Sequence, residues 1–371
     1  MNAMKKIWLK LTTLCICLPL AVGLASCEGE DGPDPEPQPT ATTGAYIINT
    51  GNWGANDGSL QWYDFTTGEV SSDLYAAQNG QGIGDLQDLC VYGSKLYAIS
   101  ATSSKVEILE RSGKLVKSLP MTTDAGQPME PRYATAGEGC VFFTAYDGTV
   151  SRLDTLTQEI TGTVEVGNYP EALAYANGKL FVNISGLSGD EFGGNGNLVA
   201  VVDAKTMTKL RDITVLQNPY IQSLTGADGY VYVVSNGNYA GSEYIPEDQW
   251  VYQTLQRIDP STYEVEELCH ASYIANAGDK MYILYSEYYL PETRRCYVYD
   301  LVNGTETDLP IAVDSFTSPG FIQVDPLSED IYIGDSPYSA LSTVYVYDKD
   351  GQPKTSFETG MYTTNIRFVT E

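Results

Sequence analysis

The residues that could carry out catalysis in this chain are few and scattered. Histidine occurs once, as His270 in LCHASY, so a Ser-His-Asp arrangement or a multi-histidine metal site would depend on that single residue. Carboxylates such as Glu243, Glu247 and Asp248 could pair for acid–base work or hold calcium, but they lack the oxygen-ligand spacing of an EF-hand. The glycine-rich FGGNGN (192–197) leads into a strand pattern and not into a helix, unlike a phosphate loop. We therefore predict no catalytic residue, no metal site and no cofactor, with a hydrolase or lyase as the less favoured alternative.

Aromatic side chains, in contrast, gather in long polar segments. NTGNWGANDG (49–58), SNGNYAGSEYIPEDQWVYQ (235–253) and SEYYLPET (286–293) combine tryptophan and tyrosine with Asn, Gly and Asp. Such residues offer flat apolar surfaces together with donors and acceptors for amides. The binding candidates chosen from these segments and from the start of one inner strand are Asn52, Trp53, Tyr220, Asn238, Tyr239, Trp250 and Tyr289. The alternative is that aromatics of this kind pack within their own loops, as we expect for about half of them.

A repeat positions these residues. Seven segments show the residue alternation typical of β-strands, and we call them the middle strands. Each is followed by a variable loop and then by a second strand that ends near an acidic residue. Those middle strands are AYIINT (45–50), KLYAIS (95–100), CVFFTA (140–145), KLFVNI (179–184), YVYVVS (230–235), KMYILY (280–285) and DIYIGD (330–335). The acidic residues recur every ~45 positions from Asp64 to Asp348, as in four-stranded propeller blades. No segment after residue 26 shows a convincing helical period, so the fold class is all-β, a seven-bladed β-propeller.

The two ends of the repeat are complementary. Six units have a further strand before the middle one, whereas in the first unit Tyr46 follows a proline-rich segment directly. The last segment, TTNIRFVT (363–370), has the missing pattern. We therefore expect the C-terminal strand to close the first blade, which removes exposed sheet edges. An open solenoid is the alternative.

The long loops should share one face of this ring. In a four-stranded blade, the second-to-third-strand loops and the blade-to-blade connections lie on one face, here the loop-rich face, and the short hairpins lie on the other, the short-turn face. Pro131-Arg132, Pro170-Glu171 and Pro219-Tyr220 recur at the start of innermost strands, where proline is tolerated. Arg132 should thus rim the central channel and is a candidate for an anionic group of a ligand. A salt bridge to Glu171 is an equally open alternative.

The N-terminal segment predicts export and lipidation. Residues 1–26 have a basic start and an apolar run, the form of a secretory signal, and Leu24-Ala25-Ser26-Cys27 is similar to a bacterial lipobox. We predict lipidation at Cys27, a lipidated and acidic proline-rich tether over 27–44, and the propeller over 45–371. An ordinary cleaved signal with a chance cysteine is the alternative.

Charge and cysteine content exclude other classes. The chain has a net charge of −27, and the signal holds three of the 21 Lys and Arg and none of the 48 Asp and Glu, which leaves −30 after cleavage. A nucleic-acid partner is excluded, since phosphate binding needs a basic surface. The cysteines of the propeller lack metal-type spacing, and we expect them as buried apolar residues, with a Cys269–Cys296 disulfide left open.

The chain resembles the YncE-like propeller lipoproteins of Bacteroides. The resemblance rests on Asn49-Thr50-Gly51-Asn52-Trp53, then Ser59-Leu60 and Tyr63-Asp64, together with the lipobox and tether; Thr50 stands where glutamate is common. It implies a lipid-anchored protein on the outer face of the outer membrane. Its best-understood members, of the BtuG type, imply that the loop-rich face binds a corrinoid (cobalamin) and passes it to a TonB-dependent transporter. A surface glycan- or other small-molecule-binding propeller is the alternative.

Overall fold

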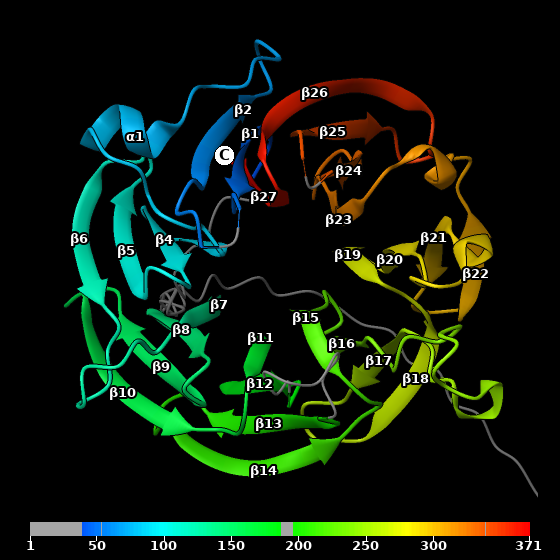
Figure 1. The fold of residues 1–371 in the computed structure, drawn as a ribbon, viewed down its shortest axis with the longest axis horizontal. Coiled ribbons are helices and arrows are strands. Elements are labelled where there is room, and N and C mark those ends of the chain that lie inside the picture. The colour runs from blue at the N-terminus through cyan, green and yellow to red at the C-terminus, as the bar shows by residue number, and fades with distance from the viewer. Residues whose placement is uncertain (1–38, 53, 187–195, 338) are drawn as a thin grey trace, which may run out of the picture. The chain divides into compact units, whose positions relative to one another are not determined.

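The apolar alternation of the repeats becomes seven antiparallel sheets arranged around a central channel (Figure 1). The computed structural model describes residues 39–52, 54–186, 196–337 and 339–371. Six sheets have four strands, and the first has three, in the described part of the chain. The fold predicted from the sequence, an all-β seven-bladed propeller, is confirmed.

The blades follow one another in chain order. From the channel outward, blades 1 to 4 contain these strands: β27 (Thr363–Thr370), β1 (Thr42–Asn49) and β2 (Ser59–Asp64); β3 (Asp88–Tyr92), β4 (Lys95–Ser100), β5 (Lys105–Glu110) and β6 (Leu115–Pro120); β7 (Pro131–Gly137), β8 (Cys140–Ala145), β9 (Thr149–Asp154) and β10 (Glu159–Glu165); β11 (Pro170–Ala176), β12 (Lys179–Ile184), β13 (Leu198–Asp203) and β14 (Thr208–Thr214). Blades 5 to 7 contain β15 (Pro219–Thr225), β16 (Val231–Ser235), β17 (Thr254–Ile258) and β18 (Val265–His270); β19 (Tyr273–Ala277), β20 (Lys280–Tyr285), β21 (Arg295–Asp300) and β22 (Thr305–Asp308); β23 (Pro319–Val324), β24 (Ile331–Asp335), β25 (Leu341–Tyr347) and β26 (Pro353–Met361).

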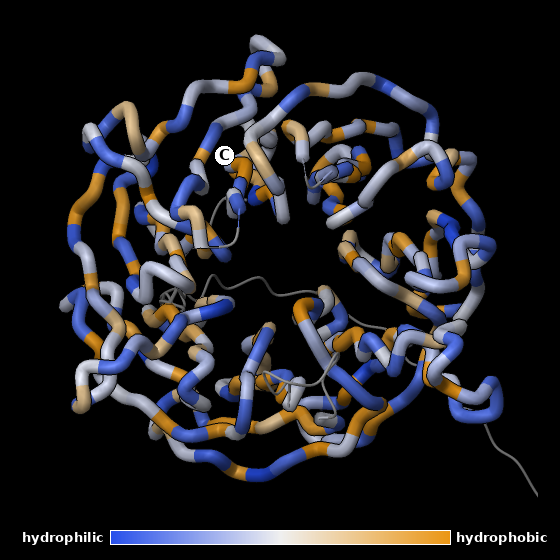
Figure 2. Tube along the Cα trace, viewed as in Figure 1, coloured by the Kyte–Doolittle hydropathy of each residue, from blue (hydrophilic) through white to orange (hydrophobic). Residues whose placement is uncertain are grey.

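The core lies between the blades. Along β8, Val141 and Phe143 enter the cluster shared with blade 2, while Phe142 enters the cluster shared with blade 4. Both faces of a middle strand are therefore buried, which explains why these strands read as nearly continuous apolar runs. Each large apolar side chain buried in this way contributes about 1.5–3 kcal/mol. Outer strands such as β14 instead mix hydrophilic and hydrophobic residues (Figure 2).

The ring closes through its first and last strands. β27 pairs antiparallel with β1, with Ile366 opposite Ile47 and Arg367 opposite Tyr46. At one end of the pair, the Thr363 hydroxyl donates to the Asn49 side-chain oxygen at 2.6 Å. The predicted closure is confirmed, and β1 begins at Thr42, taking in three residues that the sequence analysis assigns to the tether.

The first blade departs from the repeat. In place of an outer strand it has a single bridge between Tyr63 and Val70, followed by helix α1 (Leu74–Asn79). The Asp73 carboxylate accepts the Tyr75 and Ala76 N–H groups and so caps the helix, and Tyr75 is fully buried. The expectation of no helix after residue 26 is wrong here, because six residues fixed by a cap and one buried ring are too few to show a period.

Three short 3-10 helices lie among the described residues. The 3-10 helices η1 (Glu247–Gln249), η2 (Pro291–Thr293) and η3 (Val313–Ser315) all lie on the loop-rich face. Among the described residues, the helices are too short or too polar to cross a membrane.

The four described cysteines are all free thiols. Cys296 is buried, and Cys90, Cys140 and Cys269 are half-buried, so Cys269 and Cys296 are not bonded to each other.

Candidate functional site

A channel with a volume of about 1330 Å³ runs between the innermost strands. This exceeds the roughly 300–1,000 Å³ typical of small-molecule pockets. Its mouth on the loop-rich face is formed where the inner strands begin, and the side chains there include Gln87, Arg132, Tyr220, Tyr239 and Tyr362. The mouth is therefore rich in tyrosine hydroxyls and amides, which suits a ligand with many polar groups on a broad surface.

Arg132 lies at this mouth, but it is paired. Its side chain is 6% exposed, its Nε is 3.3 Å from Glu171 Oε2, and its Nη1 donates to Gln87 Oε1 at 2.7 Å. The Tyr146 hydroxyl donates to the other Glu171 oxygen at 2.7 Å, and the guanidinium lies 4.5 Å from the centre of the Tyr146 ring. Burial raises the pKa of the Glu171 carboxyl, and the Arg132 charge opposes that rise. The structure thus forms the salt bridge that the sequence left open, and an anionic ligand would have to compete with Glu171.

Three candidate tyrosines come together between blades 5 and 6. Tyr220 and Tyr239 line the channel mouth, and the Tyr239 ring packs edge-on against Tyr289 at 6.5 Å between centroids. Tyr289 in turn packs edge-on against Tyr288 at 4.8 Å, and these two rings are 44% and 76% exposed. Burial raises the pKa of Tyr220 to about 12, so its hydroxyl remains protonated at physiological pH. This group of rings is a stepped aromatic surface leading from solvent into the channel.

The remaining candidates lie in loops held by their own contacts. Asn52 is exposed and donates through its backbone N–H and its side chain to the Asp57 carboxylate, at 2.7 and 2.9 Å. Asn238 holds the 236–253 loop by donating to the Gln249 carbonyl and accepting the Val251 N–H. Trp53 lies outside the described residues.

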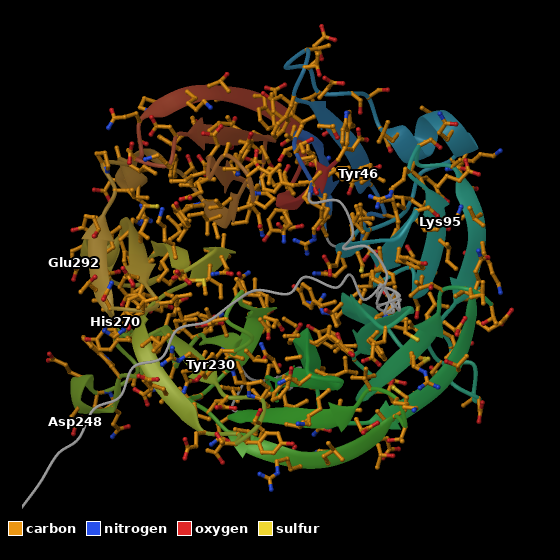
Figure 3. All side chains as sticks on the ribbon, turned by 180° about the vertical axis from the view of Figure 1, so that it is seen from behind. Tyr46, Lys95, Tyr230, Asp248, His270 and Glu292 are labelled. Atoms are coloured by element: carbon orange, nitrogen blue, oxygen red, sulfur yellow. The ribbon has the colours of Figure 1, made fainter. Side chains whose placement is uncertain are left out.

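Trp250 also belongs to the 236–253 loop. Its indole N–H donates to the Ile245 carbonyl at 2.9 Å, and its ring packs edge-on against Tyr252 at 6.3 Å. This is the packing within a loop that the sequence analysis expects of about half the aromatics. Figure 3 shows Asp248, two residues earlier, on the part of this loop that projects beyond the ring.

His270 packs against two tyrosines and lies near the Glu287 carboxylate. It lies exposed at the end of β18, with its ring stacked on Tyr285 at 5.4 Å and tilted against Tyr252 at 5.3 Å (Figure 3). Within the described residues, no group of three or more His, Cys, Asp or Glu side chains is arranged to hold a metal ion.

The family profile described as "Domain of unknown function (DUF5074)" matches residues 43–268. The chain belongs to this family. The DUF5074 match runs from β1 to β18, that is, from the first blade to the fifth. A search of curated proteins finds no match.

Solved structures with the same architecture are distant in sequence. A Bacteroides fragilis protein named "putative 6-phosphogluconolactonase" is 13% identical, with a TM-score of 0.61 over 90% of this chain and 100% of that one. Kuenenia stuttgartiensis hydrazine synthase is 13% identical, with a TM-score of 0.54 over 75% and 93% of the two chains. Citrobacter koseri AztD is also 13% identical, with a TM-score of 0.53 over 88% and 98%. At this identity the similarity shows the propeller fold alone.

Two residues at or beside the channel mouth of this DUF5074 chain, Gln87 and Tyr146, were not among those predicted from the sequence. Gln87 immediately precedes β3, the inner strand of blade 2, where no proline marks the position, and its amide donates to the Tyr133 hydroxyl at 3.0 Å. Tyr146 lies beside the mouth, where it contacts Arg132 and Glu171. Gln87 could have been identified from its position immediately before the inner strand of its blade. Tyr146 follows a middle strand, and no sequence pattern points to it.

Proposed function

We propose that this chain is an outer-membrane surface lipoprotein that binds a corrinoid on its loop-rich face and passes it to a TonB-dependent transporter. The observation that carries the proposal is the tyrosine surface formed by Tyr220, Tyr239 and Tyr289 at the mouth of a channel of about 1330 Å³. The resemblance of the first blade to YncE-like lipoproteins supports the ligand class and the transporter.

The chemistry of a corrinoid suits this surface. A corrinoid is broad and flat, with a rim of amide side chains and one phosphodiester. Aromatic rings pack against its apolar edges, while tyrosine hydroxyls and side-chain amides pair with its own amides. Recognition of this kind is selective, because a buried polar group left without a partner costs about 1–3 kcal/mol. Binding without catalysis fits the packing of the one histidine, His270, against two tyrosines.

Titration calorimetry with cyanocobalamin, and separately with host or dietary oligosaccharides, tests the ligand. We expect saturable cyanocobalamin binding that Tyr239→Ala and Tyr289→Ala weaken at least tenfold. Tyr230→Ala is the matched control, because Tyr230 lies on the short-turn face, where its ring packs against Arg257 at 4.7 Å (Figure 3). If the wild-type protein binds an oligosaccharide and does not bind cyanocobalamin, the ligand is a glycan and the corrinoid proposal is wrong.

Surface location needs a separate test. We expect protease added to intact cells to digest the wild-type propeller, and Cys27→Ala to release the protein from the membrane fraction. A wild-type protein that resists protease on intact cells, yet is digested after lysis, would contradict surface display.

A further inference from the structure

Tyr362 is the single residue that joins β26, the outer strand of blade 7, to β27, the inner strand of blade 1. Its half-buried side chain lines the channel at the loop-rich end, where the inner strands begin. Its backbone lies in the left-handed region, with a φ of 54°. In that region the Cβ of an ordinary residue crowds the neighbouring backbone, so glycine adopts it at lower cost. The position therefore requires a conformation that glycine meets best, and yet a large aromatic ring occupies it.

The surrounding hydrogen bonds fix the backbone of this connection. The Tyr362 carbonyl accepts the Thr50 N–H at 3.0 Å, which ties the turn to the loop that follows β1. The next residue, Thr363, donates its N–H to Ser342 Oγ at 3.0 Å. Because the chain is held on both sides, the conformation at Tyr362 is imposed by the closure of the ring and not by the tyrosine itself.

The same conformation leads into other inner strands. The residues immediately before β7, β11 and β15 also have positive φ angles, of 55°, 51° and 62°, and they are Glu130, Tyr169 and Asn218. Left-handed backbone is thus a property of the blade-to-blade connection, whichever side chain it carries. The fold determines the turn, and the ring that Tyr362 presents to the channel needs a separate explanation.

Tyr362 faces the tyrosine surface from another side of the channel. Tyr220 is the second residue of β15 in blade 5, and β15 and β27 lie on different sides of the channel (Figure 1). Burial raises the pKa of Tyr220 to about 12, and Glu171 adds to the rise while Arg132 opposes it. Tyr239 and Tyr362 make smaller contributions to the same rise. The hydroxyls of these two tyrosines are therefore within electrostatic reach of Tyr220 at the mouth.

We propose that Tyr362 is a further ligand contact, and that the ligand spans the channel mouth from the tyrosine surface of blade 5 to the junction of blades 7 and 1. This inference rests on the proposed function, because it concerns the same ligand. Rings on two sides of the mouth provide apolar surfaces for the edges of one broad molecule, and their hydroxyls provide donors and acceptors for its polar groups. A ligand that contacts both sides must be about as wide as the channel, which fits a corrinoid better than a single sugar ring.

Titration calorimetry with cyanocobalamin separates a role of the ring from a role of the turn. Tyr362→Gly satisfies the backbone and removes the ring, and we expect it to weaken binding at least tenfold. Tyr362→Phe keeps the ring and loses the hydroxyl, and its affinity should lie between those of the wild type and Tyr362→Gly. Tyr263→Gly is the matched control, with the wild-type affinity expected. Tyr263 also has left-handed backbone, with a φ of 67°, but it lies in the β17–β18 turn on the short-turn face, where its ring packs against Arg211 at 4.5 Å.

Equal cyanocobalamin affinity in the wild type and Tyr362→Gly would overturn this inference and leave corrinoid binding intact. If the wild type binds an oligosaccharide and not cyanocobalamin, the corrinoid proposal is wrong, and the oligosaccharide titrated into Tyr362→Gly then tests the contact by the same tenfold criterion. A wild type that binds neither ligand overturns both proposals. Melting curves show whether Tyr362→Gly is folded. If it is not, Tyr362→Asn replaces it with the same expectation, because asparagine tolerates left-handed backbone.

Discussion

Arg132 and Glu171 form a buried ion pair next to the channel. Their side chains are 6% and 0% exposed, and Gln87 and Tyr146 provide further hydrogen bonds to the pair. Taking two charges out of water is costly, so such a pair is not itself a large source of stability. The pair supports the fold only while both members are present, because either charge alone would be buried without a counter-charge. The pair therefore fixes the position of the polar groups at the channel mouth.

Replacing one member of this pair should be strongly destabilising. Glu171→Gln keeps the shape but leaves the Arg132 charge unbalanced, so we expect a loss of about 3 kcal/mol in the free energy of unfolding by urea. The matched control is Glu266→Gln, which breaks the exposed Arg257–Glu266 pair, with side chains 22% and 60% exposed. That change should cost less than about 1 kcal/mol. Equal losses in the two variants would show that burial of the first pair has no special effect.

At the scale of the elements, the recurring acidic residues have a structural role. In six blades an aspartate where the third strand gives way to the turn accepts two N–H groups of that turn: Asp64, Asp154, Asp203, Asp259, Asp300 and Asp348. Short polar side chains bind nearby backbone in this way and so define turns. The ~45-residue spacing read from the sequence is thus the spacing of one hairpin in each blade.

One of these turns should make stability depend on acidity. Hydrogen bonds from the Thr206 backbone and hydroxyl, then from the Lys205 backbone, lower the pKa of Asp203 below its ordinary value of 3.8. Because the unfolded carboxyl has the higher pKa, its stabilising contribution is complete above that value and is lost as pH falls through the folded pKa. Asp203→Asn should therefore lower the urea midpoint slightly at pH 7, and the difference from wild type should disappear on acidification. The exposed Asp314→Asn in η3 is the control, with no difference at pH 7; a gap for Asp203→Asn that widens in acid would contradict the argument.

Strands and turns were readable from the sequence because they repeat. Period-2 alternation, the aspartates and the spare strand at 363–370 each recur or complement one another, so seven blades and their closure follow. Helix α1 occurs once. It depends on the Asp73 cap and the buried Tyr75, and no repeated sequence pattern indicates either of them. Loop contacts are equally particular: whether Trp250 faces a ligand or its own loop depends on the position of the Ile245 carbonyl. The face of the ring could be predicted, but the partners of each aromatic ring could not.

At the scale of the whole molecule, closure joins all the blades into one cooperative unit. Removing residues 363–371 exposes an edge of β1, removes Ile366, which is 1% exposed, and uncovers the apolar side chains packed in the same cluster, among them Ile47. We expect the truncated protein to aggregate or to lose its single cooperative melting transition, as measured by size-exclusion chromatography and calorimetry. Val302→Ala, in an exposed turn, is the control and should melt like wild type. A truncated protein that stays monomeric with an unchanged melting curve would show that β27 is dispensable.

The pairing of β1 with β27 also sets an order of events in time. β1 lies among the first described residues and β27 follows every other strand, so their hydrogen bonds join positions more than 300 residues apart. Contacts between such distant positions form slowly, because the chain loses the conformational entropy of closing a long loop before the stabilising contacts form. Blades 2 to 7 each consist of consecutive strands and can form as the chain emerges, whereas β1 and β2 must wait. Through all of that interval the edge of β1 is open to wrong partners, and a chaperone that shields it would act on these eight residues first.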